Sequence, residues 1–148
     1  MTHDRRVVTF IIDEPFEISL RMLRRALAQE GLRVPCEVDT SARLKKELGV
    51  GLKDSIVLYV DTPILLLEAT VLNVAGSLYV PEPVVLSNSG AQSVVVVRSI
   101  KPLLDDAFSN SVREAIMLLH ERILRAIQTI GQREAAFHNT QNEHAIPV

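Results

Sequence analysis

The sequence contains no tryptophan, a single cysteine and few other aromatic residues, and each shortage excludes a class of protein. Four Phe and two Tyr in 148 residues leave few side chains on which nucleic-acid bases or sugar rings could stack. The single cysteine, Cys36, excludes an internal disulfide framework and a cysteine-rich zinc site. Sixteen Lys and Arg stand against eighteen Asp and Glu, so the chain also lacks the basic surplus of a dedicated nucleic-acid binder.

Long apolar runs are missing as well. Residues 1–20 contain four acidic residues and no more than three apolar residues in a row, which is too short for the core of a secretory signal. The most apolar stretch, residues 63–80, begins with Pro63 and is followed at once by Pro81. A helix that crosses a bilayer needs about 20 predominantly apolar residues. We therefore expect no membrane partner, no nucleic-acid partner and a cytoplasmic location.

The overall composition is that of an ordinary globular domain, with 47% hydrophobic and 23% charged residues. A chain of this length buries about 68–70% of its unfolded surface, so it needs neither a disulfide nor a metal ion to hold a core. We expect a single α+β domain over residues 1–137 and a flexible polar tail over residues 138–148.

Hydrophobic periodicity predicts the elements of this domain. β-branched and aromatic residues over 5–13 predict a buried strand, and apolar residues four and three apart from Phe16 to Leu27 predict a helix that ends at Gly31. The further elements expected are a strand over 32–38, a short helix through Leu48, a strand over 56–60, a helix over 64–74, and a hairpin of strands 84–87 and 93–99. Together they predict an α+β sandwich with an about five-stranded mixed or antiparallel sheet and packed helices.

Two of the helices bear on assembly. The helix over residues 64–74 is apolar almost all round, so its outer face must be covered, and a partner subunit is the expected cover. A long C-terminal helix over 105–136 carries a narrow apolar seam, which docks either on the sheet or on a second copy. The seam consists of Phe108, Val112, Ile116, Leu119, Ile123, Ile127 and Ile130.

No motif for catalysis or metal binding stands out. The four histidines include no pair spaced four residues apart on a helix and no HExxH motif, and we expect His120 to be an ordinary surface or partly buried residue. No serine lies in a GxSxG turn. The sequence therefore assigns no catalytic residue, no metal ligand and no cofactor.

A candidate ligand pocket comes from polar-tipped residues in the most apolar third of the chain. These are Tyr59, Asp61, Tyr79 and Glu82. A carboxylate buried there would need a partner or would have a raised pKa. The same residues also fit helix caps and contacts at strand edges, and that alternative stays open.

Several short segments follow one another in an order that resembles a known family. They are the helix ending at Gly31, Asp39 before the Leu-rich helix of residues 43–49, Asp61-Thr62-Pro63, Glu68-Ala69, and Tyr79-Val80-Pro81-Glu82. The series resembles the bacterial domain-of-unknown-function 302 family over residues 16–97. Both cysteines of the family pattern are replaced here, by Asp61 and Glu82. The resemblance implies a compact α+β fold, homodimerisation and no established activity.

Two functions fit these observations. The first is a homodimeric module that binds a small molecule or another protein and has no catalytic activity. The alternative is a small enzyme in which Asp61 and Glu82 act as acid and base in one pocket. A variant of that alternative is a protein that binds a hard metal ion through the same carboxylate oxygens.

Overall fold

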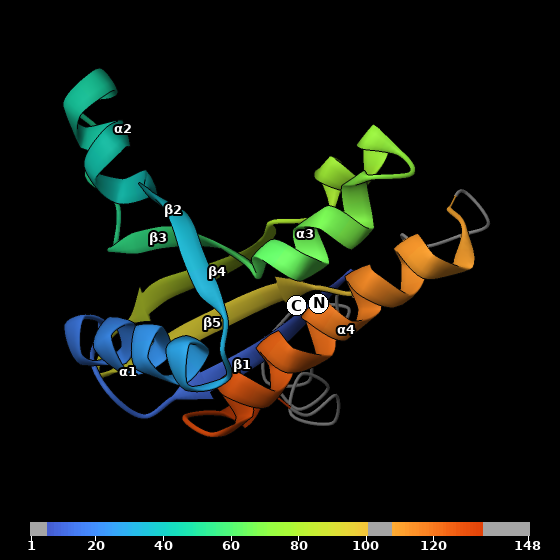
Figure 1. Cartoon of the computed structure of the whole chain (residues 1–148). Helices are drawn as coiled ribbons and strands as arrows, with labels where there is room; N and C mark the ends of the chain where they lie inside the picture. Colours follow the sequence, from blue (N-terminus) through green and yellow to red (C-terminus); the bar gives the residue numbers. More distant parts are fainter. Residues whose placement is uncertain (1–5, 101–107, 135–148) are drawn as a thin grey trace, which may run out of the picture.

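A six-stranded antiparallel sheet forms the frame of the molecule (Figure 1). The computed structural model describes residues 6–100 and 108–134. In chain order the elements are β1 (Val7–Ile12), α1 (Phe16–Gln29), β2 (Arg33–Asp39), α2 (Thr40–Leu48), β3 (Ser55–Asp61), α3 (Pro63–Thr70), the 3-10 helix η1 (Val74–Leu78), β4 (Glu82–Ser89), β5 (Gln92–Arg98), α4 (Asn110–Gln128) and β6 (Gln132–Arg133).

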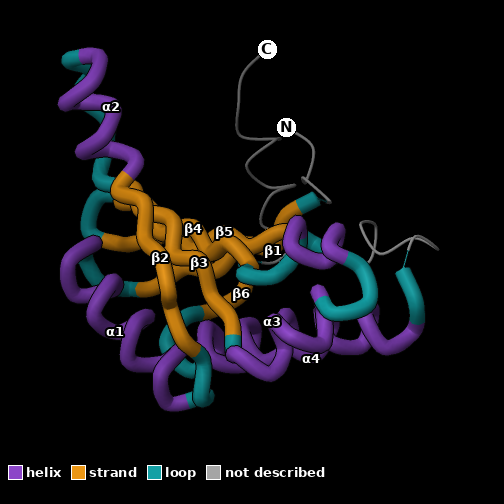
Figure 2. Tube along the Cα trace, turned by 45° about the horizontal axis from the view of Figure 1, so that its top comes forward, coloured by secondary structure: helices purple, strands orange, loops and turns teal. Residues whose placement is uncertain are grey.

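The strands lie in the order β2-β3-β4-β5-β1-β6, and each neighbouring pair is antiparallel. Helices α1, α3 and α4 pack on one face of this sheet, and α2 extends from one corner (Figure 2). Asp39 begins α2 by accepting a hydrogen bond from the backbone N–H of Ala42, and Gly49 ends it in the left-handed conformation. The predicted α+β fold is confirmed.

The hydrophobic core lies between the sheet and these helices. Side chains alternate along each strand, so that Phe10, Leu58 and Leu86 point toward the helices and are fully buried. The seam of α4 packs on the sheet of its own chain, because its central residues are buried there. These are Val112, Ile116, Leu119, Ile123 and Ile127, with Phe108 and Ile130 partly buried at the two ends.

The structure changes the expected elements in two places. The sheet has six strands where about five were expected, because the long helix ends at Gln128 and the chain returns as β6 beside β1. Gly131 permits this return, since a Cβ atom there would lie 2.9 Å from the carbonyl oxygen of Ile11. The apolar helix ends at Thr70, and η1 follows after Asn73, whose side chain caps it. The helix start predicted at residue 105 and the tail over 138–148 lie outside the described residues.

Candidate functional site

Glu82 is a fully buried carboxylate at the start of β4. It lies opposite Val60 of β3, on the face of the sheet that the helices cover. Its Oε2 atom lies 2.9 Å from Nδ1 of His120, which belongs to α4 and whose side chain is 12% exposed. The other oxygen, Oε1, has no hydrogen-bond partner among the described residues. The structure thus joins a carboxylate and an imidazole that lie 38 positions apart in the sequence.

This contact fixes the imidazole of His120. When Glu82 is ionised, Nδ1 of the ring donates to it, because an ionised carboxylate only accepts hydrogen bonds. The ring is then held in one orientation, and Nε2 is left to interact with another partner. Carboxylates use the same arrangement to orient histidines in metal sites and in catalytic dyads.

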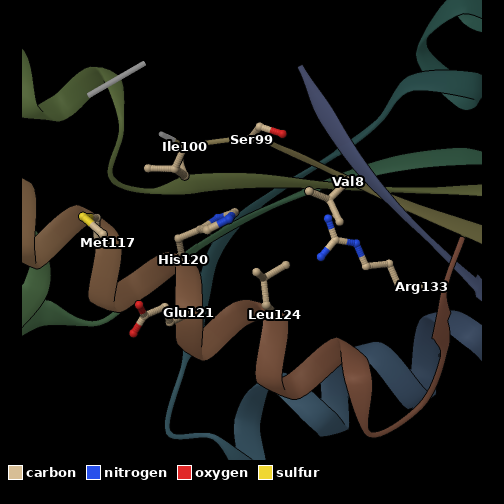
Figure 3. Close-up of a pocket in the computed structure, with 8 residues that line it drawn as sticks. All are labelled: Val8, Ser99, Ile100, Met117, His120, Glu121, Leu124 and Arg133. Atoms are coloured by element: carbon tan, nitrogen blue, oxygen red, sulfur yellow. The ribbon is translucent and has the colours of Figure 1, made fainter. Parts of the chain in front are cut away.

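His120 lines a pocket between α4 and the strands β1, β5 and β6 (Figure 3). The pocket has a volume of about 360 Å³, at the lower end of the range for small-molecule sites. Its walls are Val8, Ser99, Ile100, Met117, His120, Glu121, Leu124 and Arg133. In Figure 3 the imidazole projects toward Ser99 and Val8, and the guanidinium of Arg133 extends into the same space from the opposite side. Half of the lining residues are aliphatic or thioether side chains, so the pocket suits a small, partly apolar molecule.

The sequence-predicted residues occupy several different environments. Asp61, the last residue of β3, is 6% exposed and lies opposite Arg33 of β2. Burial raises the pKa of the Asp61 carboxyl, and the positive charge of Arg33 opposes part of that shift. Because side chains alternate along a strand, Asp61 and Tyr59 point to the face opposite Val60 and Glu82.

Tyr79 packs in yet another place, between η1 and β4. Its ring meets Phe108 edge-on at 5.3 Å between centroids, and the Arg98 guanidinium lies 5.2 Å from the centre of the same ring. The structure therefore brings Glu82 to His120, and it does not bring Glu82 to Asp61. None of the four predicted residues lines the pocket at His120. As a ligand site, Tyr59, Asp61, Tyr79 and Glu82 stay a prediction.

His120 is partly buried, as expected, but sequence reasoning did not join it to the candidate site, although two signals pointed to its contact with Glu82. Glu82 stands directly before a strongly apolar strand, and a buried carboxylate needs a partner. His120 follows Leu119 of the apolar seam, so it lies near the face of α4 that packs on the sheet. What the sequence does not supply is the packing of α4 across the start of β4.

A second candidate site is the apolar surface of α3 and η1, which we call the α3–η1 surface. Only Leu65 and Ala69 of α3 are buried. The large apolar side chains around them are between 62% and 81% exposed, and they are Ile64, Leu67, Val71, Leu72, Val74 and Leu78. Gly76 lets η1 fold back closely on α3, because a Cβ atom there would collide with the carbonyl oxygen of Ala69.

The α3–η1 surface continues into a groove between α3 and α4. The groove has a volume of about 510 Å³ and is lined by Glu68, Val71, Leu72, Ser111, Glu114, Ala115 and Leu118. Contiguous exposed apolar surface of this kind marks interaction sites in soluble proteins. The sequence predicts that the helix over residues 64–74 has an apolar outer face that its own domain does not bury. The exposure of these side chains agrees with that prediction.

Residues 6–100 and 108–134 contain neither a metal-binding cluster nor a membrane-spanning helix. No group of three or more His, Cys, Asp or Glu side chains there is placed to hold a metal ion. No helix in these ranges is long and apolar enough to cross a membrane.

The fold and the buried histidine–glutamate pair define a small α+β protein with one open antiparallel sheet. The chain belongs to the DUF302 family, a domain of unknown function whose sequence model matches residues 8–130. The resemblance stated from the sequence is thereby confirmed, and it extends beyond residues 16–97. The chain has no significant match among curated proteins.

A solved structure has the same fold. It is the crystal structure of an uncharacterized conserved DUF302 protein from Bacillus stearothermophilus, with a TM-score of 0.74 and 14% sequence identity. The similarity covers 84% of this chain and 97% of that chain. At this identity the comparison shows a shared fold and carries nothing about activity.

Proposed function

We propose that this protein is a homodimeric binding module without catalytic activity. The observation that carries the proposal is the α3–η1 surface, where large apolar side chains stay exposed although the rest of the core is well buried. Each exposed apolar side chain that is removed from water contributes about 25 cal/mol per Å² of buried area. A partner that covers this surface therefore stabilises the module.

A second copy of the chain fits this surface better than a charged partner does. Residues 63–78 contain one charged residue, Glu68, and the adjoining groove adds Glu114, so the surface offers few groups for an ion pair. In a twofold dimer the same patch meets itself, and an apolar patch is complementary to its own copy. The α3–α4 groove, with Leu118 on its far wall, gives the partner's side chains a place to insert.

The oligomeric state tests this proposal. Sedimentation equilibrium of the wild-type protein is expected to give twice the 16.4 kDa monomer mass at micromolar concentration. The double variant Leu67→Glu/Leu72→Glu is expected to give the monomer mass, because charges cannot be buried at the interface without partners.

The matched control places the same charges on another exposed leucine pair. Leu48 and Leu52 are 70% and 53% exposed and lie at the end of α2 and in the loop after it. The variant Leu48→Glu/Leu52→Glu is expected to remain dimeric. A monomeric wild type would refute the proposal, and so would dissociation of both variants to the same extent.

The ligand-binding part of the proposal rests on the pocket at His120. A buried carboxylate that orients an imidazole toward a pocket is an arrangement that positions a polar contact for a bound molecule. The alternative with Asp61 and Glu82 as an acid–base pair or as ligands of a hard metal ion gains no support from the geometry, because strand alternation directs the two side chains to opposite faces of the sheet.

A further inference from the structure

The pocket at His120 contains two nitrogen groups that face one space. Nδ1 of His120 is engaged by Glu82, so Nε2 is the ring nitrogen left for a ligand, and the ring projects into the pocket in Figure 3. Arg133 of β6 lies opposite Phe10 of β1, and residues opposite each other in a sheet share a face. Phe10 is buried toward the helices, so Arg133 also projects to the helix side. Among the described residues, Arg133 has no ion pair or side-chain hydrogen bond.

The remaining walls are largely apolar. Val8 and Leu124 lie on either side of the Arg133 guanidinium in Figure 3, and Ile100 and Met117 close the end of the pocket beyond His120. The Glu121 carboxylate points away from Arg133, toward the outer rim. The interior thus combines hydrogen-bond donors for an anion with an aliphatic surface for a short hydrocarbon chain.

We propose that this pocket binds a small aliphatic monocarboxylate, with the carboxylate group between the Arg133 guanidinium and Nε2 of His120. The hydrocarbon chain lies against Leu124, Met117 and Ile100. This inference deepens the ligand-binding part of the proposed function, and it does not depend on dimerisation because the pocket and the α3–η1 surface share no lining residue.

The bound carboxylate and its nearest groups form pairs of opposite charge. Arginine binds carboxylates through two parallel hydrogen bonds, and the Glu121 carboxylate that lines the pocket points away from the Arg133 guanidinium in Figure 3. An imidazole that donates from both nitrogens is positively charged. Glu82 with His120 and the ligand with Arg133 then form two neutral pairs. A dicarboxylate would bring an unbalanced charge against Ile100 and Met117, and the pocket therefore selects a monocarboxylate.

The test compares hexanoate with hexanamide, which has the same shape and no charge. In amide NMR spectra of the ¹⁵N-labelled full chain, hexanoate is expected to shift the signals of pocket residues such as Val8, Ser99 and Leu124. It is also expected to move the ring Nε2 resonance of His120, which a merely structural histidine would not show. Hexanamide is expected to bind about tenfold more weakly or worse, because it lacks the charge-assisted hydrogen bonds.

Two arginine variants locate the carboxylate. Arg133→Gln is expected to weaken hexanoate binding by about tenfold or more, and it should leave the fold intact because Arg133 is exposed on a short edge strand. Arg43→Gln, an exposed position on α2 far from the pocket, is the matched control and is expected to bind like the wild type. Equal binding of hexanoate and hexanamide, equal affinities of the two variants, or shifts that map outside the pocket would each overturn the inference.

The test of hexanoate binding is independent of the test of dimerisation. Hexanoate is expected to bind the monomeric Leu67→Glu/Leu72→Glu variant as it binds the wild type. A dimer that takes no hexanoate refutes the ligand inference alone, whereas a monomer that takes hexanoate refutes the dimer alone.

Discussion

Two hollows lie along helix α4, and they differ in the groups that line them. The groove toward α3 is lined by the exposed aliphatic side chains of Val71, Leu72 and Leu118, together with the carboxylates of Glu68 and Glu114. The pocket toward β1, β5 and β6 is lined by an imidazole, a guanidinium, a hydroxyl and the Glu121 carboxylate, and its imidazole is held by a buried carboxylate. The first is suited to another apolar surface, and the second is suited to a small polar group with an apolar body.

The sequence pattern predicts that carboxylates are buried, but it does not predict which of them contacts a pocket residue. Glu82 and Asp61 are both buried near the same end of neighbouring strands. Glu82 has a direct hydrogen-bond partner and orients a pocket residue, whereas Asp61 lies opposite Arg33 in the register of β3 and the edge strand β2. The element packed over each carboxylate decides its role.

The largest expected effect comes from removing the partner of Glu82. His120→Ala leaves a fully buried carboxylate without a hydrogen bond, and breaking a buried pair in this way costs about 3–5 kcal/mol. Urea denaturation measures the loss in the free energy of unfolding. Glu121→Ala, at the next and exposed position of the same helix, is the control and should change stability by less than about 0.5 kcal/mol.

The double variant Glu82→Leu/His120→Leu sharpens this test. Replacing both members of a buried pair by apolar side chains removes the unpaired charge, so much of the lost stability should return. A loss below about 1 kcal/mol for His120→Ala would contradict the view that the pair is a buried, mutually dependent unit.

A smaller effect is expected at the turn that shapes the α3–η1 surface. Gly76→Ala places a methyl group against the backbone of Ala69, which forces η1 away from α3 at a cost of about 1–3 kcal/mol. Thermal denaturation measures this cost, and sedimentation shows the accompanying weakening of the dimer. Gly51→Ala is the control, since a Cβ atom there meets nothing within 4 Å. If the two variants behave alike, the close approach of η1 to α3 has no structural importance.

Salt is expected to affect the two sites differently, with a few-fold change in the affinity for hexanoate and no weakening of the dimer. Raising ionic strength from about 0.05 M to about 0.5 M shortens the Debye length several-fold and weakens attraction between exposed charges. Hexanoate binding at Arg133 is therefore expected to weaken a few-fold, while the apolar dimer should keep its dissociation constant or tighten. The measurements are NMR titration and sedimentation at both salt concentrations. A dimer that dissociates as salt is added would contradict an apolar interface.

The smallest effect is expected at Asp61. Its pKa is raised above the usual value of 3.8 by burial, so the charged form is disfavoured in the folded state. The raised pKa therefore contributes stability that is fully present below pH 3.8. This contribution to the free energy of unfolding is lost as pH rises through the pKa of the folded state. Asp61→Asn should abolish this loss and stabilise the protein at neutral pH by less than about 1 kcal/mol, because Arg33 and solvent offset part of the penalty.

The control for Asp61 is Asp54→Asn, at an exposed position before β3. It should leave the stability at neutral pH unchanged within about 0.5 kcal/mol. If Asp61→Asn lowers stability at neutral pH, the attraction to Arg33 outweighs the burial of the carboxyl.

The sequence predicts the fold well because local signals determine its elements. Period-two burial along β1, β3 and β5 and the seam of α4 follow directly from the positions of apolar residues. The end of α4 was wrong by several residues, since the chain turns at Thr129 to pair as β6, and a two-residue strand leaves no periodic signal.

The candidate site could be predicted only in part. The exposed apolar helix follows from residues 64–74 alone, because no arrangement of one small domain buries every face of it. The apolar surroundings of Glu82 in the sequence predict it as a candidate site residue, but they do not predict His120 as its partner. The contact with His120 and the placement of Arg133 depend on how α4 and β6 pack on the sheet, and neither follows from spacing along the chain.

Hydrogen exchange at two protein concentrations tests the homodimer most directly. If a second copy covers the α3–η1 surface, amides of residues 63–78 gain protection at the higher concentration, while amides near Leu48 and Leu52 do not. Exchange over residues 63–78 that is independent of concentration, in a sample whose mass is that of the monomer, would contradict the account.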